Sequence, residues 1–198
     1  LDFVHVANLS LHTEDSNSFI VKVIEELYEI PSLWQPLDQS VRNGFQTNGD
    51  LLNHTTGNLF ALKSMILKEI ESYYVKFKNE ACSFIKKWPT EKEISSWHVI
   101  LKEQGYNTLH IHPEGWLSGV IYLKVVPTLD KDEGAIEFNL SGPGFFSETS
   151  SKIIYKPQIG DIIFFPSSLH HRTIPFTTDT ERIVVSFDLL PKANSDIN

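Results

Sequence analysis

Cysteine is nearly absent from the chain, since Cys82 is the single one among 198 residues. No disulfide can therefore form within the chain, and such sparing use of cysteine is typical of proteins from reducing compartments. The sequence also lacks any run of about 18 or more apolar residues, which argues against a membrane-spanning helix. Its first residues show no basic-then-apolar signal pattern. We therefore expect a cytoplasmic protein.

Positive charge is scarce as well. The 17 Lys and Arg are outnumbered by 25 Asp and Glu, and the formal net charge is −8. This balance argues against nucleic acid or an anionic membrane as the main partner. Hydrophobic residues make up 41% of the chain, and a chain of this length can bury a sizeable core. We expect one globular domain over residues 1–198.

The chain divides into a helical first part and a strand-rich second part. Apolar residues at helical spacing predict helices at 18–28 and 59–75, with a shorter one at 81–87. Loop or turn signals lie at 31–36, 44–50 and 105–106. Strands are predicted at 1–12, 95–101, 108–112, 118–126, 135–140, 152–155, 162–165 and 182–189.

This layout predicts an α+β fold that is mainly β with N-terminal helices. Short strands at regular spacing favour a jelly roll, with the helices packed on its outside. We expect a helical support region over about residues 1–92 and a jelly-roll core over about 93–190. The first strand would lie at a sheet edge, which leaves room for a homodimer.

Two histidines one residue apart, His110 and His112, open the segment that runs to Leu123. Alternate residues of a strand point to the same face, so the two imidazoles are expected to project together. A pair of imidazoles suits a metal site better than an apolar core. Alone, the pattern favours instead two solvent-facing histidines beside the Pro-Glu-Gly turn that follows.

A second histidine site, His170-His171, follows the apolar strand at 162–165, and Arg182 enters another apolar strand eleven residues after His171. Burying an unpaired charge is costly, and a planar guanidinium suits a bidentate carboxylate. Arg182 is thus a candidate anion anchor. The alternative is that Arg182 pairs with Glu181, Asp188 or a surface carboxylate at the mouth of the strand.

The two sites together are more specific than either alone. A jelly roll brings the ends of such strands to one mouth. Three ligands on one face would leave three open octahedral positions, the arrangement of mononuclear non-haem Fe(II) oxygenases.

With these two blocks the sequence resembles the Fe(II)/2-oxoglutarate-dependent oxygenase superfamily. It is particularly similar to a group of bacterial and viral members with a motif like His-x-His-Pro-x-x-x-Leu-Ser-Gly-Val-Tyr-Tyr. Residues 110–122 match it here except that Ile121 stands in place of the first Tyr. The later block of that group has Gly-Asp, three apolar residues, Phe-Pro-Ser, a histidine and an Arg-led strand. It matches residues 160–167, His171 and residues 182–187. The resemblance covers roughly residues 95–190.

The resemblance implies a double-stranded β-helix and a dioxygenase that hydroxylates an unidentified small molecule or peptide, with release of succinate and CO₂. It implies Fe(II) held by His110, His112 and His171, with 2-oxoglutarate and O₂ as co-substrates. The superfamily's usual motif is His-x-Asp/Glu, so His112 stands where a carboxylate is normal. A three-histidine site would be one charge unit more positive. The alternative is a shifted unit in which His112 and Glu114 supply His-x-Glu.

We favour the all-histidine site, because His110 and His112 share a face and the gap to the following strand then suits the superfamily. For the distal ligand we favour His171 over His170, which would point away.

The resemblance also implies a place for the co-substrate. Arg182 would hold the far carboxylate of 2-oxoglutarate, Tyr122 would hydrogen-bond the same carboxylate, and Ser118 would line that pocket. Trp97 and Trp116 would flank the mouth, or else simply pack in the core or rim.

Two rival functions remain open. Gly105 followed by His-x-His resembles the start of a cupin motif, which favours a cupin-type metal enzyme without 2-oxoglutarate. The Glu expected shortly after the second histidine is absent, however, and Arg182 is left unexplained. The other rival is a non-enzymatic jelly roll that binds a ligand.

Overall fold

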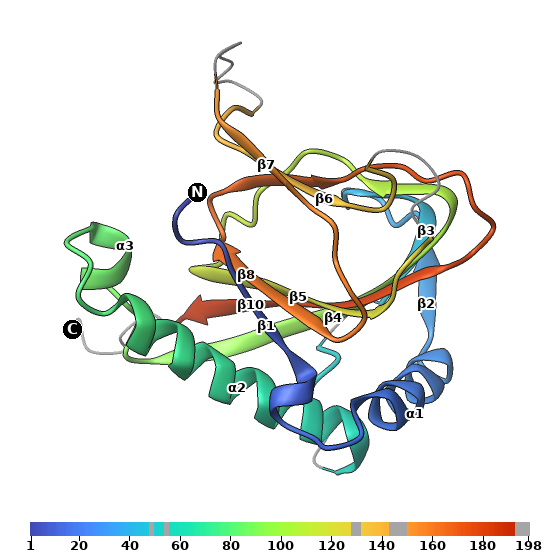
Figure 1. Cartoon of the computed structure of the whole chain (residues 1–198), viewed down its shortest axis with the longest axis horizontal. Coiled ribbons are helices and arrows are strands. Elements are labelled where there is room, and N and C mark those ends of the chain that lie inside the picture. Colours follow the sequence, from blue (N-terminus) through green and yellow to red (C-terminus); the bar gives the residue numbers. More distant parts are fainter. Residues whose placement is uncertain (48–49, 54–55, 128–131, 143–149, 193–198) are drawn as a thin grey trace.

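The computed structural model describes residues 1–47, 50–53, 56–127, 132–142 and 150–192. Its strands form two antiparallel sheets that face each other, with the helices beneath the larger one (Figure 1). The larger sheet has seven strands in the order β1-β8-β5-β10-β4-β3-β2, and the smaller has three in the order β7-β6-β9. The predicted mainly β fold with helices outside is confirmed.

The elements have the following bounds. The helices are α1 (Ser16–Tyr28), α2 (Gly57–Phe77) and α3 (Ser83–Lys86), with a 3₁₀ turn η1 (Leu9–Leu11). The strands are β1 (His5–Asn8), β2 (Ser32–Trp34), β3 (Val41–Thr47), β4 (Lys92–Asn107), β5 (Leu117–Lys124), β6 (Ile136–Asn139), β7 (Lys152–Tyr155), β8 (Asp161–Pro166), β9 (His170–Thr173) and β10 (Arg182–Pro191). Among the described residues, no helix is long and apolar enough to cross a membrane.

Two apolar cores lie on opposite faces of the larger sheet. One fills the space between that sheet and the helices and includes Leu62 and Ile66 of α2 and Ile121 of β5. The other lies between the two sheets and includes Phe138 of β6 and Phe165 of β8. Because both faces of the central strands are covered, β5 and β10 are buried almost throughout. Their sequences accordingly read as continuous apolar runs rather than as alternating ones.

The two long predicted helices are confirmed. α1 starts two residues earlier than predicted, because the carboxylate of Asp15 accepts a hydrogen bond from the Ser18 backbone at 2.9 Å and so caps the helix. α2 contains all of the predicted segment and buries Leu62, Ile66 and Ile70 along one face. Helical periodicity therefore identified the layer that covers the larger sheet.

Two strands occupy segments that were predicted to be loops. β2 lies inside 31–36, and β3 overlaps 44–50. Gly44 explains the error: a Cβ there would lie 2.8 Å from the carbonyl oxygen of Ile100 on β4. The glycine that signalled a loop instead lets two strands approach closely.

Two further predictions around β4 were wrong. The turn expected at Gly105-Tyr106 lies inside β4, at an irregularity where Gln104 has φ +60° and the pairing with β3 shifts register. The strand expected at 108–112 is absent, since only His110 forms an isolated bridge there. β9, which carries the second histidine site, was not predicted as a strand. Its four residues include Arg172, which pairs across to Glu137 with two hydrogen bonds of 2.9–3.0 Å.

Candidate metal centre

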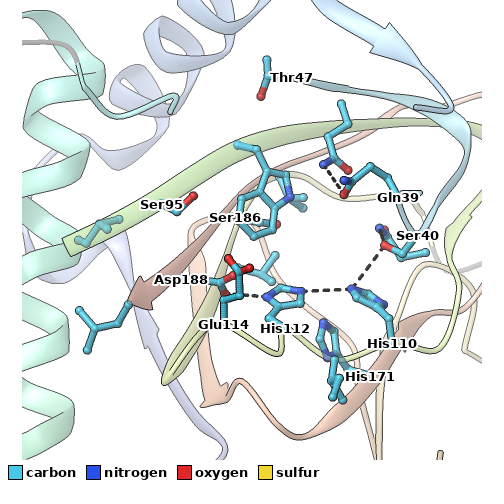
Figure 2. Close-up of a pocket in the computed structure, with 18 of the residues that line it drawn as sticks. Gln39, Ser40, Thr47, Ser95, His110, His112, Glu114, His171, Ser186 and Asp188 are labelled. Atoms are coloured by element: carbon cyan, nitrogen blue, oxygen red, sulfur yellow. Dashed lines mark hydrogen bonds and ion pairs between the residues drawn. The ribbon is translucent and has the colours of Figure 1, made fainter. Parts of the chain in front are cut away.

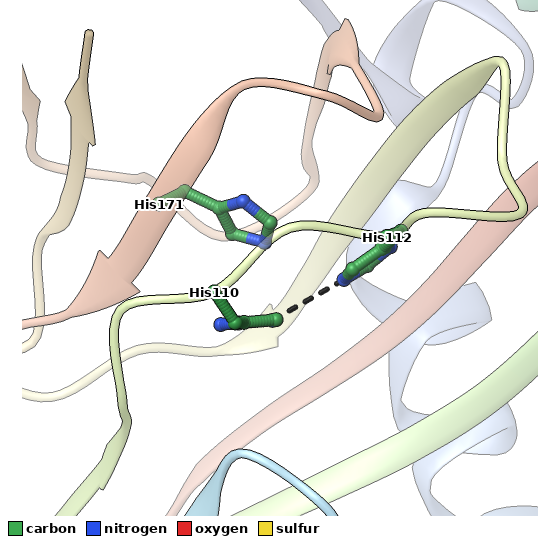
Figure 3. Close-up of side chains that lie close together, drawn as sticks. All are labelled: His110, His112 and His171. Carbon is green, nitrogen blue, oxygen red and sulfur yellow. Dashed lines mark hydrogen bonds between the residues drawn. The ribbon is translucent and has the colours of Figure 1, made fainter. Parts of the chain in front are cut away.

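Three histidines converge between the two sheets. His110 and His112 lie in the segment that joins β4 to β5, and His171 lies on β9. One ring nitrogen of each lies within 4.8 Å of the others (Figure 3). The backbone of His110 donates to His171 at 3.1 Å and accepts from it at 3.0 Å. Chain segments far apart in the sequence are thus fixed together by their own backbones.

The second nitrogen of each ring is already engaged. Nδ1 of His110 lies 2.6 Å from the carbonyl oxygen of Thr108, and Nδ1 of His171 lies 2.9 Å from that of Leu169. Nδ1 of His112 lies 2.6 Å from a carboxylate oxygen of Asp188. Carbonyl and carboxylate oxygens accept hydrogen bonds, so each Nδ1 carries the proton and donates it. In the resulting neutral tautomers, all three Nε2 atoms keep a free lone pair.

This donor set fits a metal ion. Nε2 of His110 and Nε2 of His112 lie 3.2 Å apart, within hydrogen-bond distance (Figure 3), and in the tautomers described above a cation between them would satisfy both lone pairs. Imidazole nitrogens bind metals such as Zn²⁺ at about 2.0–2.1 Å, so two of them at about 90° around one ion would be separated by about 3 Å. Hydrogen bonds from Nδ1 to oxygen acceptors are also the usual support for metal-binding histidines.

Burial keeps two of these rings neutral, as metal ligands must be. Burial lowers the pKa of His110 to about 4, against the opposing effect of the Thr108 carbonyl. Burial, helped by the neighbouring imidazoles of His110 and His112, holds the pKa of His171 well below its usual value.

A polar network lies behind His112. The hydroxyl of Ser118 donates to the same Asp188 oxygen at 2.6 Å, and it lies 2.8 Å from the hydroxyl of Ser167. Ser118 and Asp188 are cross-strand partners on β5 and β10. The structure therefore places Ser118 beside the support of His112. The sequence analysis considered Asp188 only as a partner for Arg182. The feature that could have indicated its role is the presence of an acidic residue inside an apolar strand.

Arg182 and Tyr122 form the other end of the site. Arg182 is 2% exposed and Tyr122 is fully buried, and the guanidinium carbon lies 4.9 Å from the centroid of the Tyr122 ring. Nε of Arg182 has no hydrogen-bond partner in the part of the chain that the structure describes, and the Tyr122 hydroxyl interacts with the guanidinium of Arg182. Burial lowers the pKa of Arg182 and raises that of Tyr122, while each group opposes the shift of the other.

The carboxylates that were considered as partners of Arg182 are engaged elsewhere. Glu181 contacts Lys102 and Lys124. Asp188 lies six residues further along the same strand, which corresponds to about 20 Å of extended chain. Among the described residues, no carboxylate forms an ion pair with Arg182. An anion that enters from outside the chain would satisfy this buried cation.

One cavity of about 1230 Å³ contains the histidines, Arg182 and Tyr122 in its lining. Trp97 also lines it, with its ring centroid 5.5 Å from that of His112. Figure 2 shows Gln39 and Ser40 in the cavity lining on the side of His110, and the Ser40 hydroxyl lies 3.4 Å from Nε2 of His110.

Three other sequence candidates have different surroundings. Glu114 is exposed and lines the cavity, but it is not part of the cluster of converging ligand atoms. His170 packs against Gly142, where a Cβ would lie 1.9 Å from its Nε2. Trp116 stacks on Phe84 and donates from Nε1 to the Phe84 carbonyl at 3.1 Å. Packing thus accounts for Trp116, whereas Trp97 faces the cavity.

Comparison with known proteins gives one family match. Residues 95–188 match the model of a family described as "Putative 2OG-Fe(II) oxygenase". No curated protein matches the chain in sequence.

Several solved structures share the fold. A prolyl-4-hydroxylase from Pseudomonas putida has a TM-score of 0.66 at 11% identity, over 96% of this chain and 93% of its own. A prolyl hydroxylase from Trichoplax adhaerens, in complex with a hypoxia inducible factor peptide fragment, has a TM-score of 0.66 at 12% identity, over 94% of this chain and 83% of its own. HygX from Streptomyces hygroscopicus, with nickel and 2-oxoglutarate bound, has a TM-score of 0.63 at 12% identity, over 96% of this chain and 83% of its own. The expected double-stranded β-helix is confirmed.

Proposed function

We infer the function of this chain from its place in the Fe(II)/2-oxoglutarate-dependent oxygenase superfamily, to which the match of residues 95–188 and the fold assign it. The cofactors are accordingly Fe(II) and 2-oxoglutarate, with O₂ as the second co-substrate. We propose that the enzyme hydroxylates a substrate in the cavity beside the histidine triad, with release of succinate and CO₂.

The single observation that carries the proposal is the pairing of two unsatisfied groups in one cavity. In one part of the cavity, three unprotonated Nε2 atoms converge. In another part, the buried Arg182 lacks a carboxylate partner among the described residues. Fe(II) would be held by His110, His112 and His171. The far carboxylate of 2-oxoglutarate would be held by Arg182 and the Tyr122 hydroxyl, since both groups offer hydrogen-bond donors there.

When bound, Fe(II) and 2-oxoglutarate supply the activation of O₂ and its delivery to the substrate. The contribution of the chain is to fix geometry and exclude water. The backbone bridge between His110 and His171 sets the spacing of two ligands. Arg182 orients the co-substrate, and its burial strengthens its attraction for a carboxylate because the local dielectric is low.

The substrate is a polar small molecule or a peptide. The cavity wall around Trp97 carries amides and hydroxyls, including Gln39, Gln46 and Ser186. Ser186 is 7% exposed, and an apolar substrate that covered its hydroxyl would remove water from that group at a cost in free energy. The prolyl hydroxylase that binds a peptide fragment has this fold, which is compatible with a peptide substrate.

The cupin rival explains the histidines but not Arg182. A cupin-type enzyme needs no anion anchor, so a buried, unpaired guanidinium would be a cost without a purpose. A non-enzymatic binding protein would likewise not need three imidazoles with their lone pairs aimed at one point.

The test is turnover of 2-oxoglutarate to succinate by protein loaded with Fe(II) under exclusion of air and then exposed to O₂. We expect succinate from the wild type and a loss of most of it in His171→Ala and in Arg182→Ala. Metal binding without any effect of 2-oxoglutarate would favour the cupin. Absence of metal binding would leave only the binding protein.

A further inference from the structure

The metal centre has an unusual charge. The superfamily motif noted above has an acidic residue where this chain has His112, so the ligands contribute no negative charge. A carboxylate is nevertheless present, one contact further out. Asp188 of β10 lies 2.6 Å from Nδ1 of His112, on the opposite side of the ring from the convergent Nε2.

Asp188 is held in place by a built pocket. Ser118 donates to the oxygen that also contacts His112, and Ser118 in turn contacts Ser167. The side chain of Asp188 is buried, with 7% of the residue exposed. Gly115 passes directly over it: a Cβ there would lie 2.5 Å from Oγ of Ser167 and 3.3 Å from Cγ of Asp188. A larger residue than glycine cannot take this path without displacing the pocket.

The charge of Asp188 has no fixed counterion. Among the described residues, its only ion-pair partner is the imidazole of His112, and no Lys or Arg contacts it. A buried carboxylate that meets only an imidazole and a hydroxyl, with no Lys or Arg, is poorly compensated. A divalent cation on Nε2 of His112 would supply the missing positive charge through the ring.

We propose that Asp188 is the charge-balancing positioning residue of this centre, and that it gives the all-histidine site the negative charge that a carboxylate ligand would otherwise supply. The inference rests on the proposed function, because it presupposes a divalent metal on the triad. Asp188 acts through His112 and does not bind the metal. It fixes the ring by accepting the Nδ1 proton in a hydrogen bond and increases the electron donation from Nε2.

The test compares two substitutions by their affinity for Co²⁺, measured without O₂ from the visible absorption of the bound ion. Asp188→Asn keeps an oxygen that accepts from His112 but removes the charge. Asp188→Ala removes both. If charge is what matters, both variants bind Co²⁺ about 10- to 100-fold more weakly than the wild type, the usual effect of removing such a partner.

The chain offers a matched control. Glu69 of α2 is a buried carboxylate that contacts a histidine, His12, at the same 2.6 Å, and it lies outside the cavity. Glu69→Gln should keep the Co²⁺ affinity of the wild type. Thermal unfolding of each metal-free variant shows whether it is folded before it is titrated.

Two results would overturn the inference. One is an Asp188→Asn variant that binds Co²⁺ as tightly as the wild type while Asp188→Ala does not, because Asp188 would then only orient the ring. The other is unchanged affinity in both variants. In either case the wild type still binds metal and turns over 2-oxoglutarate, so the proposed function survives. A wild type that binds no Co²⁺ would instead remove the proposed function and this inference together.

Discussion

The backbone N–H of His110 donates to the carbonyl oxygen of His171 at 3.1 Å, and the N–H of His171 donates to the carbonyl oxygen of His110 at 3.0 Å. These contacts form an isolated antiparallel bridge at the mouth of the sandwich. Two of the proposed ligands, from segments about sixty residues apart, are therefore held at their separation by the fold itself. A site that is formed in advance does not need the metal to assemble it, so the metal-free protein should be folded.

The first prediction concerns the identity of the ligands. His171→Ala should lower the affinity for Co²⁺ by at least about 100-fold, because one of three converging donors is lost. Glu114→Gln should leave the affinity within about twofold of the wild type, since Glu114 lies outside the cluster of donor atoms. Titration of both variants with Co²⁺ without O₂ checks this. A large loss in Glu114→Gln would instead support His112 and Glu114 as the ligand pair.

The second prediction is that replacing Arg182 has opposite effects on 2-oxoglutarate binding and on thermal stability. Arg182→Met should weaken 2-oxoglutarate binding by about 2–5 kcal/mol, the range for removing one partner of a buried charged pair. The same variant should raise the unfolding temperature of the protein without co-substrate, because an unpaired buried charge is replaced by an apolar side chain. Calorimetric titration and thermal melts measure the two effects. A lower unfolding temperature would show that Arg182 serves the fold rather than the co-substrate.

The third prediction links the two sequence blocks. Gly119 and Phe187 are cross-strand partners on β5 and β10, and a Cβ on Gly119 would lie 2.1 Å from Cζ of Phe187. Gly119→Ala should therefore destabilise the fold by about 1–3 kcal/mol through overpacking. In a Phe187→Leu background the same change should cost clearly less. Urea unfolding of the four proteins of this cycle measures the coupling, and additive effects would mean that the two residues do not compete for space.

The fourth prediction is a pH dependence of stability. His98 is fully buried, neither of its ring nitrogens has a partner within the described ranges, and burial lowers its pKa from 6.5 to about 4. Below pH 6.5 the His98 side chain binds a proton in the unfolded chain but stays unprotonated in the folded state. Stability therefore decreases as the pH is lowered from 6.5 to about 4. Between pH 7 and pH 5 this corresponds to about 2 kcal/mol.

His98→Leu should remove this share of the acid sensitivity. Urea unfolding of both proteins at pH 7 and pH 5 isolates the effect of His98, because every other titrating group is common to the two. Equal losses of stability in wild type and variant would show that His98 is not the source.

Sequence reasoning reached the fold where periodicity and burial act together. The helix at Gly57–Phe77 and the central strands β5 and β10 were predicted because their apolar residues must face a core. β3 and the continuation of β4 were missed for the opposite reason. At Gly44 and Gly105 a glycine permits close packing between strands, and sequence alone does not separate that use from a turn.

The candidate site divides in the same way. His110, His112 and His171 converge although the expected strand at 108–112 does not exist, and their role as ligands stays a prediction. A backbone bridge, rather than strand alternation, brings the rings together. Asp188 was missed because its role depends on cross-strand register, which places it under Ser118 and against His112. β5 and β10 are far apart in the sequence, so the pattern within either strand does not by itself show which residues face each other.

The most direct test of the central claim is a crystal structure grown without O₂ in the presence of Fe(II) and 2-oxoglutarate. We expect one iron bound by Nε2 of His110, His112 and His171, with the far carboxylate of 2-oxoglutarate on Arg182 and the Tyr122 hydroxyl. Iron bound by the Glu114 carboxylate, or 2-oxoglutarate absent from Arg182 at saturating concentration, would contradict the account.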